Sequence, residues 1–267
     1  MISLNDIVID ESIFRYNQPI NWTDSSELAL LNSSIKQIGL TNPLLITRDK
    51  KDRYQLIDGF KRALVLKKNG QEQVNCICLP SATDIIDILQ LIISNHKLYQ
   101  DDKLVERIKF IHLCKRLSLP QRQIIDDIFP LLNLTGNKKI LTRFDKMGSL
   151  PEEVLQFAQE KKLSQSRCYS LTKYSPLLIK QIFLWREKIN LTASILDELL
   201  NSLTAIILRE KTTAELFFAD RFLTELFDSD ESNQNRTQKF RNWLTNRCFP
   251  ILSTTNNRMD QLLTSIK

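Results

Sequence analysis

The residues between 137 and 147 carry the clearest chemistry in this sequence, and that chemistry suits nucleic acid. Apolar residues recur there at helical spacing and predict a helix from Asn137 to Met147 with one buried face. The residues of the predicted inward face are Ile140, Leu141, Phe144 and Met147. The residues of the opposite face, which we predict to bind DNA, are Lys138, Lys139, Thr142, Arg143 and Lys146. A helix fits the major groove of B-DNA, where such side chains reach base edges and phosphates.

A second predicted helix precedes this one, so that the two have the layout of a helix-turn-helix. Ser118 can cap it, and Pro120 lies in its first turn. Its apolar side is formed by Ile124, Ile125 and Ile128. In such a motif the first helix crosses the DNA backbone and the second enters the major groove. The segment Pro130–Gly136 between the helices is longer than the usual three or four residues, and two helices that only pack together are the alternative.

The distribution of charge favours the same region. The chain has 37 basic and 31 acidic residues, for a net charge of +6. Residues 101–150 hold ten basic and six acidic residues, a net of +4, whereas residues 1–100 hold eleven of each. A local excess of this kind is where a nucleic-acid contact is expected, although a solvated helix face would look the same.

Other kinds of chemistry have little support in the composition. The cysteines are Cys76, Cys78, Cys114, Cys168 and Cys248, and the histidines are His96 and His112. Their spacing fits no usual zinc pattern, and no nucleophile, histidine and acid stand together as in a hydrolase. We therefore expect no metal centre and reduced cysteines in a cytoplasmic protein. We also expect no membrane association, since the sequence shows neither a signal peptide nor a long apolar stretch.

The first hundred residues mix strands and helices and predict a small α+β domain. The expected elements are a strand at 3–9, a helix capped by Asp24 or Ser25 and ended by Gly39, strands at 43–47 and 54–57, a helix at 60–68, a strand at 74–79 and a helix at 84–94. No strand is expected after Asp101. We predict three domains, at 1–100, 101–195 and 196–267, all but the first of them helical.

Two further segments lie in the helical part. The polar stretch 228–238 is the predicted linker. An apolar stripe precedes it, formed by Phe217, Phe218, Phe222, Leu223, Leu226 and Phe227. Helical stripes of this kind are usually buried internally, and a dimer face is the alternative.

Four motifs, in the same order along residues 1–175, resemble the ParB partition protein family. They are Gly39–Leu45, then Tyr54–Arg62 with Gly70 eleven residues after Gly59, then Leu91–Asn95 with Leu104 and Glu106, and finally 117–147 followed by Leu150–Val154 and Lys162–Ser164. The resemblance implies an α+β fold: a small mixed N-terminal ParB/sulfiredoxin-like domain, an all-α helix-turn-helix domain and a helical C-terminal region.

The resemblance also implies a nucleotide site that holds the triphosphate of CTP with Mg²⁺. The residues at the matching positions are Gly59, Lys61, Arg62 and Asn95. Gly59 would let the backbone approach a phosphate, and Lys61 and Arg62 would supply cations. The sequence departs from the family at Phe60, Leu64, Ser94 and Leu98, where the family has an acid, a second arginine, an acid and an arginine. Lost cations weaken phosphate binding, so the domain would bind nucleotide weakly and hydrolyse it at most as a weak CTPase.

The sequence thus predicts a ParB-like, sequence-specific DNA-binding protein in partition, or in transcription regulation on a plasmid or mobile element. Its expected partners are double-stranded DNA, a second copy in a homodimer and a partition ATPase, and its expected location is on the nucleoid or plasmid. One alternative is a nucleotide-dependent small-molecule phosphotransferase of the ParB/sulfiredoxin superfamily, with Asp58 or Glu11 as base. Another is a helical protein-interaction module. Sulfiredoxin activity is not expected, because Asp58 stands where that chemistry needs a cysteine.

Overall fold

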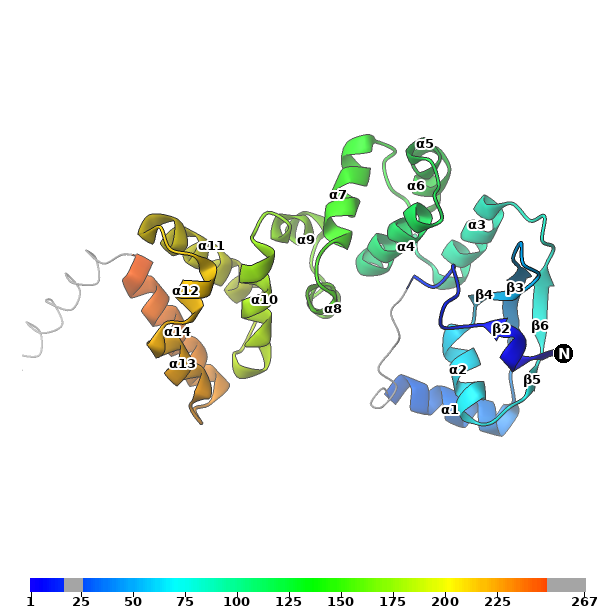
Figure 1. Ribbon diagram of the computed structural model, residues 1–267, viewed down its shortest axis with the longest axis horizontal. Helices are drawn as coiled ribbons and strands as arrows, with labels where there is room; N and C mark the ends of the chain where they lie inside the picture. Colours follow the sequence, from blue (N-terminus) through cyan, green and yellow to red (C-terminus); the bar gives the residue numbers. More distant parts are fainter. Residues whose placement is uncertain (17–25, 249–267) are drawn as a thin grey trace, which may run out of the picture. The chain divides into compact units, whose positions relative to one another are not determined.

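The computed structural model describes residues 1–16 and 26–248 (Figure 1). The predicted helix caps Asp24 and Ser25 lie outside the described residues. The chain divides into two compact units, of which the first is Met1–Gly148 and the second begins at Ser149. The three-domain division stays a prediction. Among the described residues, no helix has both the length and the apolar character needed to cross a membrane.

The first unit opens with the α+β domain that the sequence predicts. Its elements are β1 (Ile2–Ser3), β2 (Ile7–Val8), α1 (Ser26–Ile38), β3 (Leu44–Arg48), β4 (Tyr54–Asp58), α2 (Phe60–Lys68), β5 (Gln73–Val74), β6 (Cys76–Leu79) and α3 (Ile85–His96). Four strands form a mixed sheet in the order β2-β4-β3-β6, and β1 pairs with β5. Two details differ from the prediction, because a 3-10 turn, Leu4–Asp6, divides the first strand and Asn75 separates β5 from β6.

One face of this sheet packs on α2. Leu44 and Ile46 of β3 and Leu56 of β4 are fully buried against Ala63 and Leu66 of α2. Alternate residues of a strand point to one face, so the same strands present their remaining side chains to the other side. The end of β4 and the start of α2 are thereby fixed next to each other, at Asp58 and Gly59.

Three helical segments complete the first unit. They are α4 (Leu104–Arg116), a helix over 121–131 composed of α5 (Gln121–Gln123), a π-helical segment (Ile124–Ile128) and α6 (Phe129–Leu131), and then α7 (Lys138–Gly148). The π segment has a local cause, since Pro130 lacks an amide hydrogen and its ring crowds the carbonyl four residues earlier. The Phe129 amide accordingly bonds to the Ile124 carbonyl, five residues back.

Two expectations for this helix are wrong. Ser118 does not cap it, because Ser118 has a φ of 61° and the helix begins after Pro120. Pro130 does not end it either, because the shift to a π turn lets the helix continue to Leu131. The connection to α7 is therefore residues 132–137.

The second unit is helical in the part that the structure describes. Its helices are α8 (Glu152–Glu160), α9 (Gln165–Leu171), α10 (Pro176–Leu184), α11 (Ala193–Glu210), α12 (Ala214–Phe218), α13 (Arg221–Asp228) and α14 (Asn233–Cys248). The predicted linker 228–238 is wrong in extent, since α14 already begins at Asn233. Arg236 is buried there and donates to the carbonyls of Leu226, Ser229 and Glu231, which folds the polar stretch into a tight corner.

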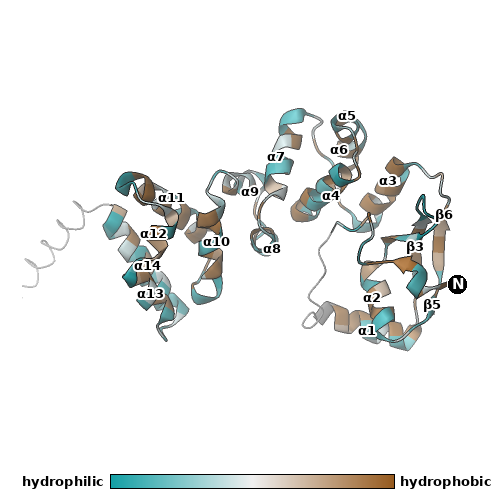
Figure 2. Cartoon of the chain, viewed as in Figure 1, coloured by the Kyte–Doolittle hydropathy of each residue, from teal (hydrophilic) through white to brown (hydrophobic). Residues whose placement is uncertain are grey.

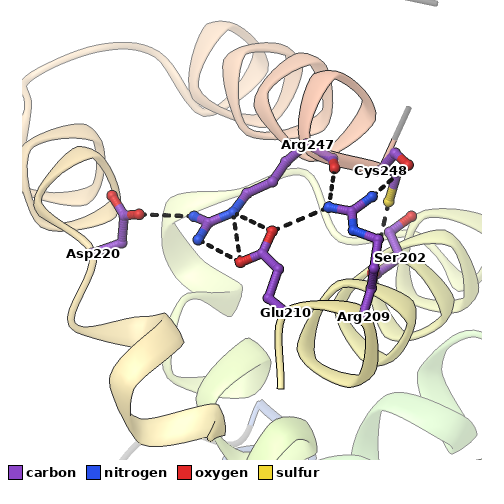
Figure 3. Close-up of polar contacts among 6 residues, drawn as sticks. All are labelled: Ser202, Arg209, Glu210, Asp220, Arg247 and Cys248. Atoms are coloured by element: carbon purple, nitrogen blue, oxygen red, sulfur yellow. Dashed lines mark hydrogen bonds and ion pairs between the residues drawn. The ribbon is translucent and has the colours of Figure 1, made fainter. Parts of the chain in front are cut away.

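The apolar stripe of α12 and α13 belongs to the core of this unit. Phe217, Leu223 and Phe227 are buried, and Phe227 stacks on Trp185 with ring centroids 3.9 Å apart. A network around Arg247 joins the surrounding helices (Figure 3). Arg247 donates to Glu210 and Asp220, so one guanidinium links α14 to the end of α11 and the start of α13.

Candidate functional site

The helix α7 has one buried and one exposed face, as its sequence predicts. Asn137 caps it, because its Oδ1 accepts a hydrogen bond from the Ile140 amide at 2.9 Å. Leu141, Phe144 and Met147 are buried, and Ile140 is half-buried. Figure 2 shows both hydrophobic and hydrophilic residues on this helix.

The five predicted DNA-binding side chains all lie on the exposed face. They are Lys138, Lys139, Thr142, Arg143 and Lys146. The Thr142 hydroxyl donates to the Lys138 carbonyl at 3.0 Å. Across residues 1–16 and 26–248, no ion pair is formed by Lys138, Lys139 or Lys146. The ammonium groups of these three lysines are therefore available to an anion outside the chain.

The first turn of α7 adds an electrostatic reason to expect an external anion. The N-terminus of a helix carries partial positive charge, and acidic residues there are favourable. Lys138 and Lys139 stand in this turn, which has no acidic residue. Each lysine costs about 0.3 to 1 kcal/mol in that position. A bound phosphate would remove this cost, because it would meet helix amides and ammonium groups together.

The opposite side of α7 is held by α4. Lys115 of α4 forms an ion pair with Asp145, the one acidic residue of α7, and the Nε2 of His112 lies 3.3 Å from the Asp145 carbonyl oxygen. Gly148 lets the two helices approach, since a Cβ atom there would lie 2.0 Å from the His112 Nε2. Lys115 thus neutralises the negative charge that would otherwise lower the positive charge of α7.

The helix 121–131 also packs against α7. The rings of Phe129 and Phe144 lie 6.3 Å apart, and both side chains are fully buried. Buried Arg107 of α4 donates to the Leu132 carbonyl at 3.3 Å and to the Asp101 carbonyl at 3.2 Å. The bond to Leu132 holds the C-terminal end of the helix 121–131 against α4. Sequence reasoning missed the roles of Arg107, His112, Lys115, Asp145 and Gly148, because contacts between helices leave no periodic signal.

A second group of polar side chains gathers where β4 meets α2. Gly59 has a φ of 99°, and a Cβ atom there would lie 2.7 Å from Leu44 Cδ2 and 3.1 Å from Arg62 Cζ. Glycine is therefore favoured both by the backbone conformation and by the close approach of Leu44, with Arg62 next to it. The Gly59 amide donates to Asp58 Oδ1 at 2.6 Å.

Asp58 is the centre of this group, which we call the Asp58 cluster: Asp58, Gly59, Arg62, Asn95 and His96. Asn95 Nδ2 donates to Asp58 Oδ2 at 3.1 Å, and His96 Nε2 lies 3.1 Å from Asp58 Oδ1. The Arg62 guanidinium forms an ion pair with the same carboxylate at 3.6 Å. Three of the four predicted nucleotide-binding residues are thus brought together, whereas Lys61 lies half-buried in the first turn of α2.

The contacts of the cluster extend beyond the carboxylate. Arg62 also donates to the carbonyls of Asn42, at 2.5 Å, and Pro43, at 2.8 Å. The Tyr16 hydroxyl lies 2.9 Å from His96 Nδ1. Sequence reasoning missed Tyr16 and His96, and the position of His96 next to Asn95 was the one signal available.

Opposing effects act on the pKa of Asp58. Burial raises it, but the hydrogen bond and charge of His96, the charge of Arg62 and the Gly59 amide outweigh burial. The net result is a pKa for Asp58 below its ordinary value of 3.8. Asp58 is therefore ionised at neutral pH, and a fully hydrogen-bonded carboxylate with a lowered pKa is a poor proton acceptor.

Other candidates for reactive groups are inert or dispersed. Burial raises the pKa of the Cys114 thiol to about 12 and that of Cys168 to about 11, which keeps both protonated at neutral pH. Within the part of the chain that the structure describes, no three His, Cys, Asp or Glu side chains are grouped so as to hold a metal ion.

Comparison with known proteins identifies the class of the N-terminal domain. Residues 3–95 match the family model described as the ParB N-terminal domain. The resemblance to the ParB family is confirmed by this match, and the small mixed sheet with its helices is a ParB-like N-terminal domain. No curated protein matches the chain.

Solved structures of ParB proteins are also similar, each at 17% sequence identity. The C-terminally truncated chromosome-partitioning protein ParB from Caulobacter crescentus complexed with CTP-gamma-S gives a TM-score of 0.29, covering 67% of this chain and 96% of that one. The same protein complexed to the centromeric parS site gives 0.35, with 74% and 97% covered. The C2221 form of a Pnob8-like ParB-N domain gives 0.36, with 85% and 96% covered.

Proposed function

We propose that this chain is a ParB-like, sequence-specific DNA-binding protein that places α7 in the major groove of double-stranded DNA. The observation that carries the proposal is the division of α7 into two faces. One face is packed against α4 and the helix 121–131, and the other presents five polar side chains, including three lysines with no ion pair among the described residues. In this proposal the helix 121–131 and α7 are the two helices of a helix-turn-helix.

The side chains of α7 divide naturally between the two tasks of DNA recognition. Contacts to phosphate set the register and give affinity, and contacts to base edges give specificity. Arg143 is the side chain best able to read a base, because a guanidinium can form two hydrogen bonds to guanine. Lys138 and Lys139, in the first turn, suit phosphates, which also compensate the helix dipole.

A selection experiment tests this proposal with the whole chain. The protein is mixed with duplexes of random sequence, bound duplexes are recovered, and a recovered duplex is then titrated at two salt concentrations. We expect one motif to be enriched, and its affinity to fall steeply with salt because lysines release counterions from the phosphates. Failure to bind, or binding that enriches no motif, would contradict sequence-specific recognition.

Partition, and transcription regulation on a plasmid or mobile element, stay predictions that depend on this binding. A homodimer, a partition ATPase partner and a cytoplasmic location on nucleoid or plasmid stay predictions as well. A dimer would be expected to bind two half-sites one helical turn of DNA apart. The apolar stripe of α12 and α13 lends no support to a dimer face. Phe217, Leu223, Leu226 and Phe227 are buried within the second unit, and the half-buried Phe218 and Phe222 pack on Trp185 and Trp243.

The phosphotransferase alternative has less support from the geometry. Its predicted base, Asp58, is held by four groups and has a lowered pKa, and the other predicted base, Glu11, is exposed to solvent. CTP and Mg²⁺ are not part of the proposed function. Gly59, Arg62 and Asn95 are directed at Asp58, so the residues present do not fit a triphosphate.

A further inference from the structure

A carboxylate of the chain itself lies among the groups that would hold a phosphate. We infer that Asp58 is an internal anion that takes the place of a nucleotide phosphate. The ParB N-terminal domain of this chain therefore keeps its fold, and any activity that depends on it, without a nucleoside triphosphate. The inference depends on the geometry of the Asp58 cluster, and it is independent of the proposed contact between α7 and DNA.

The coordination of Asp58 is the first argument. An ionised carboxylate offers about four lone-pair positions to donors. Oδ1 receives the Gly59 amide at 2.6 Å and lies 3.1 Å from His96 Nε2. Oδ2 receives Asn95 Nδ2 at 3.1 Å and faces Arg62 at 3.6 Å. Each donor is of a kind that binds phosphate, namely a helix N-terminal amide, a guanidinium, a side-chain amide and an imidazole. The anion position of this site is already filled.

The covalent link is the second argument. Asp58 directly precedes Gly59, so its carboxylate is present at the site at a high effective concentration, whereas a free phosphate must be bound from solution. A polyphosphate beside the cluster would also be repelled by the Asp58 charge. Part of the Arg62 guanidinium is also committed elsewhere, since its Nη1 donates to the carbonyls of Asn42 and Pro43 while its Nη2 faces Asp58.

The neighbours of the cluster are the third argument, because they show what the internal anion holds together. Through His96, the carboxylate is connected to the Tyr16 hydroxyl, and the Tyr16 ring meets Phe110 of α4 edge-on at 5.6 Å. Arg116 at the end of α4 donates to the Ile13 carbonyl at 3.1 Å. One anion therefore links β4, α2, α3 and, through Tyr16, α4 with no ligand.

The test is a calorimetric titration of the full chain with CTP and Mg²⁺, and separately with inorganic tripolyphosphate. The wild type is compared with Asp58→Asn and Asp58→Ala, and Asp87→Asn serves as a matched control because Asp87 is an exposed acid of α3. We expect no binding by the wild type or the control at millimolar ligand. The Asp58 variants should gain at least about a tenfold tighter association, which Arg62→Ala added to them should abolish.

The outcomes separate cleanly. Binding of CTP by the wild type that Arg62→Ala removes would overturn the inference. Folded Asp58 variants that bind neither ligand would overturn it too, because another feature would then exclude phosphate. If neither variant folds, the wild type decides: a melting temperature raised by CTP and Mg²⁺ overturns the inference, and an unchanged one supports it. DNA affinity measured with and without CTP then tests the proposed function separately.

Discussion

The first unit has two cationic regions, the start of α2 and the exposed face of α7. They differ in whether groups of the chain itself pair with the positive charge. At α2, Arg62 is surrounded by the Asp58 carboxylate and two backbone carbonyls. At α7, Lys138 and Lys139 have no ion pair among the described residues, although they stand at the unfavourable end of a helix.

A structural cation can be told from one that serves a partner by whether the chain itself satisfies its charge. A cation that is satisfied within the chain stabilises the fold and offers little to a ligand. A cation that is kept in solvent at a cost to its own helix is the kind that we propose meets an external anion. The sequence shows lysine and arginine near the predicted helix start in both regions, and the local excess of positive charge favours only the second of them.

The largest expected effect is a loss of DNA affinity when two cations of α7 are removed. The double substitution Lys139→Ala and Arg143→Ala should weaken binding to a selected duplex by about 3 kcal/mol, or about a hundredfold, in a chain that still folds as the wild type does by circular dichroism. The matched control is Lys50→Ala with Lys51→Ala, which removes two exposed charges from the β3–β4 hairpin. Equal losses in affinity for the two variants would show that α7 contributes only general charge.

A somewhat smaller effect is expected from a change in the packing of α7 against α4. Gly148→Ala should lower the free energy of unfolding by about 1 to 3 kcal/mol, because its Cβ would lie 2.0 Å from the His112 Nε2. It should also weaken DNA binding. Chemical denaturation measures the loss, and His112→Ala in the same chain should restore part of it. A Gly148→Ala variant as stable as the wild type would contradict this close packing of α4 and α7.

The pH dependence of the free energy of unfolding tests whether Asp58, at the start of α2, is ionised in the folded state. The pKa of Asp58 is lowered in the folded state, so its contribution is fully present above its ordinary value of 3.8 and is lost as the pH falls through the folded pKa. Asp58→Asn should therefore cost about 1 to 3 kcal/mol at pH 7 and less in acid. Urea unfolding at pH 7 and well below pH 3.8 measures both, and a constant difference would contradict an ionised Asp58.

The smallest effect tests the charge of α7. Lys115→Ala should leave Asp145 uncompensated and weaken DNA binding by about 0.5 kcal/mol, because both side chains are partly exposed. Adding Asp145→Asn should restore the affinity. Filter binding at low salt, where charges are screened least, is the suitable measurement. A double variant as weak as the single one would assign Lys115 a direct contact with DNA.

The prediction from sequence succeeded where the signal was periodic and local. The apolar spacing of α7 and the glycines that end α1 and α2 placed helices and strands close to their observed bounds. It failed where a distant partner decides. Nothing in the polar stretch 228–238 shows that Arg236 will be buried against the carbonyls of Leu226, Ser229 and Glu231. The π turn before Pro130 has a local cause and is hard to predict for another reason, because a proline inside a helical pattern more often ends the helix than shifts it.

The amino-acid sequence is enough to predict a mixed N-terminal domain followed by helices, and to predict which side chains of residues 138–146 face away from their own core. Both follow from the spacing of apolar residues, which a helix or strand converts directly into a buried face. The resemblance already predicts that Arg62 and Asn95 share one site, with a bound phosphate as their partner, but that their actual partner is Asp58 is seen only in the folded chain. They converge on Asp58 because the ends of β4 and α3 meet in space, and the distance between residues 58 and 95 along the chain gives no sign of it.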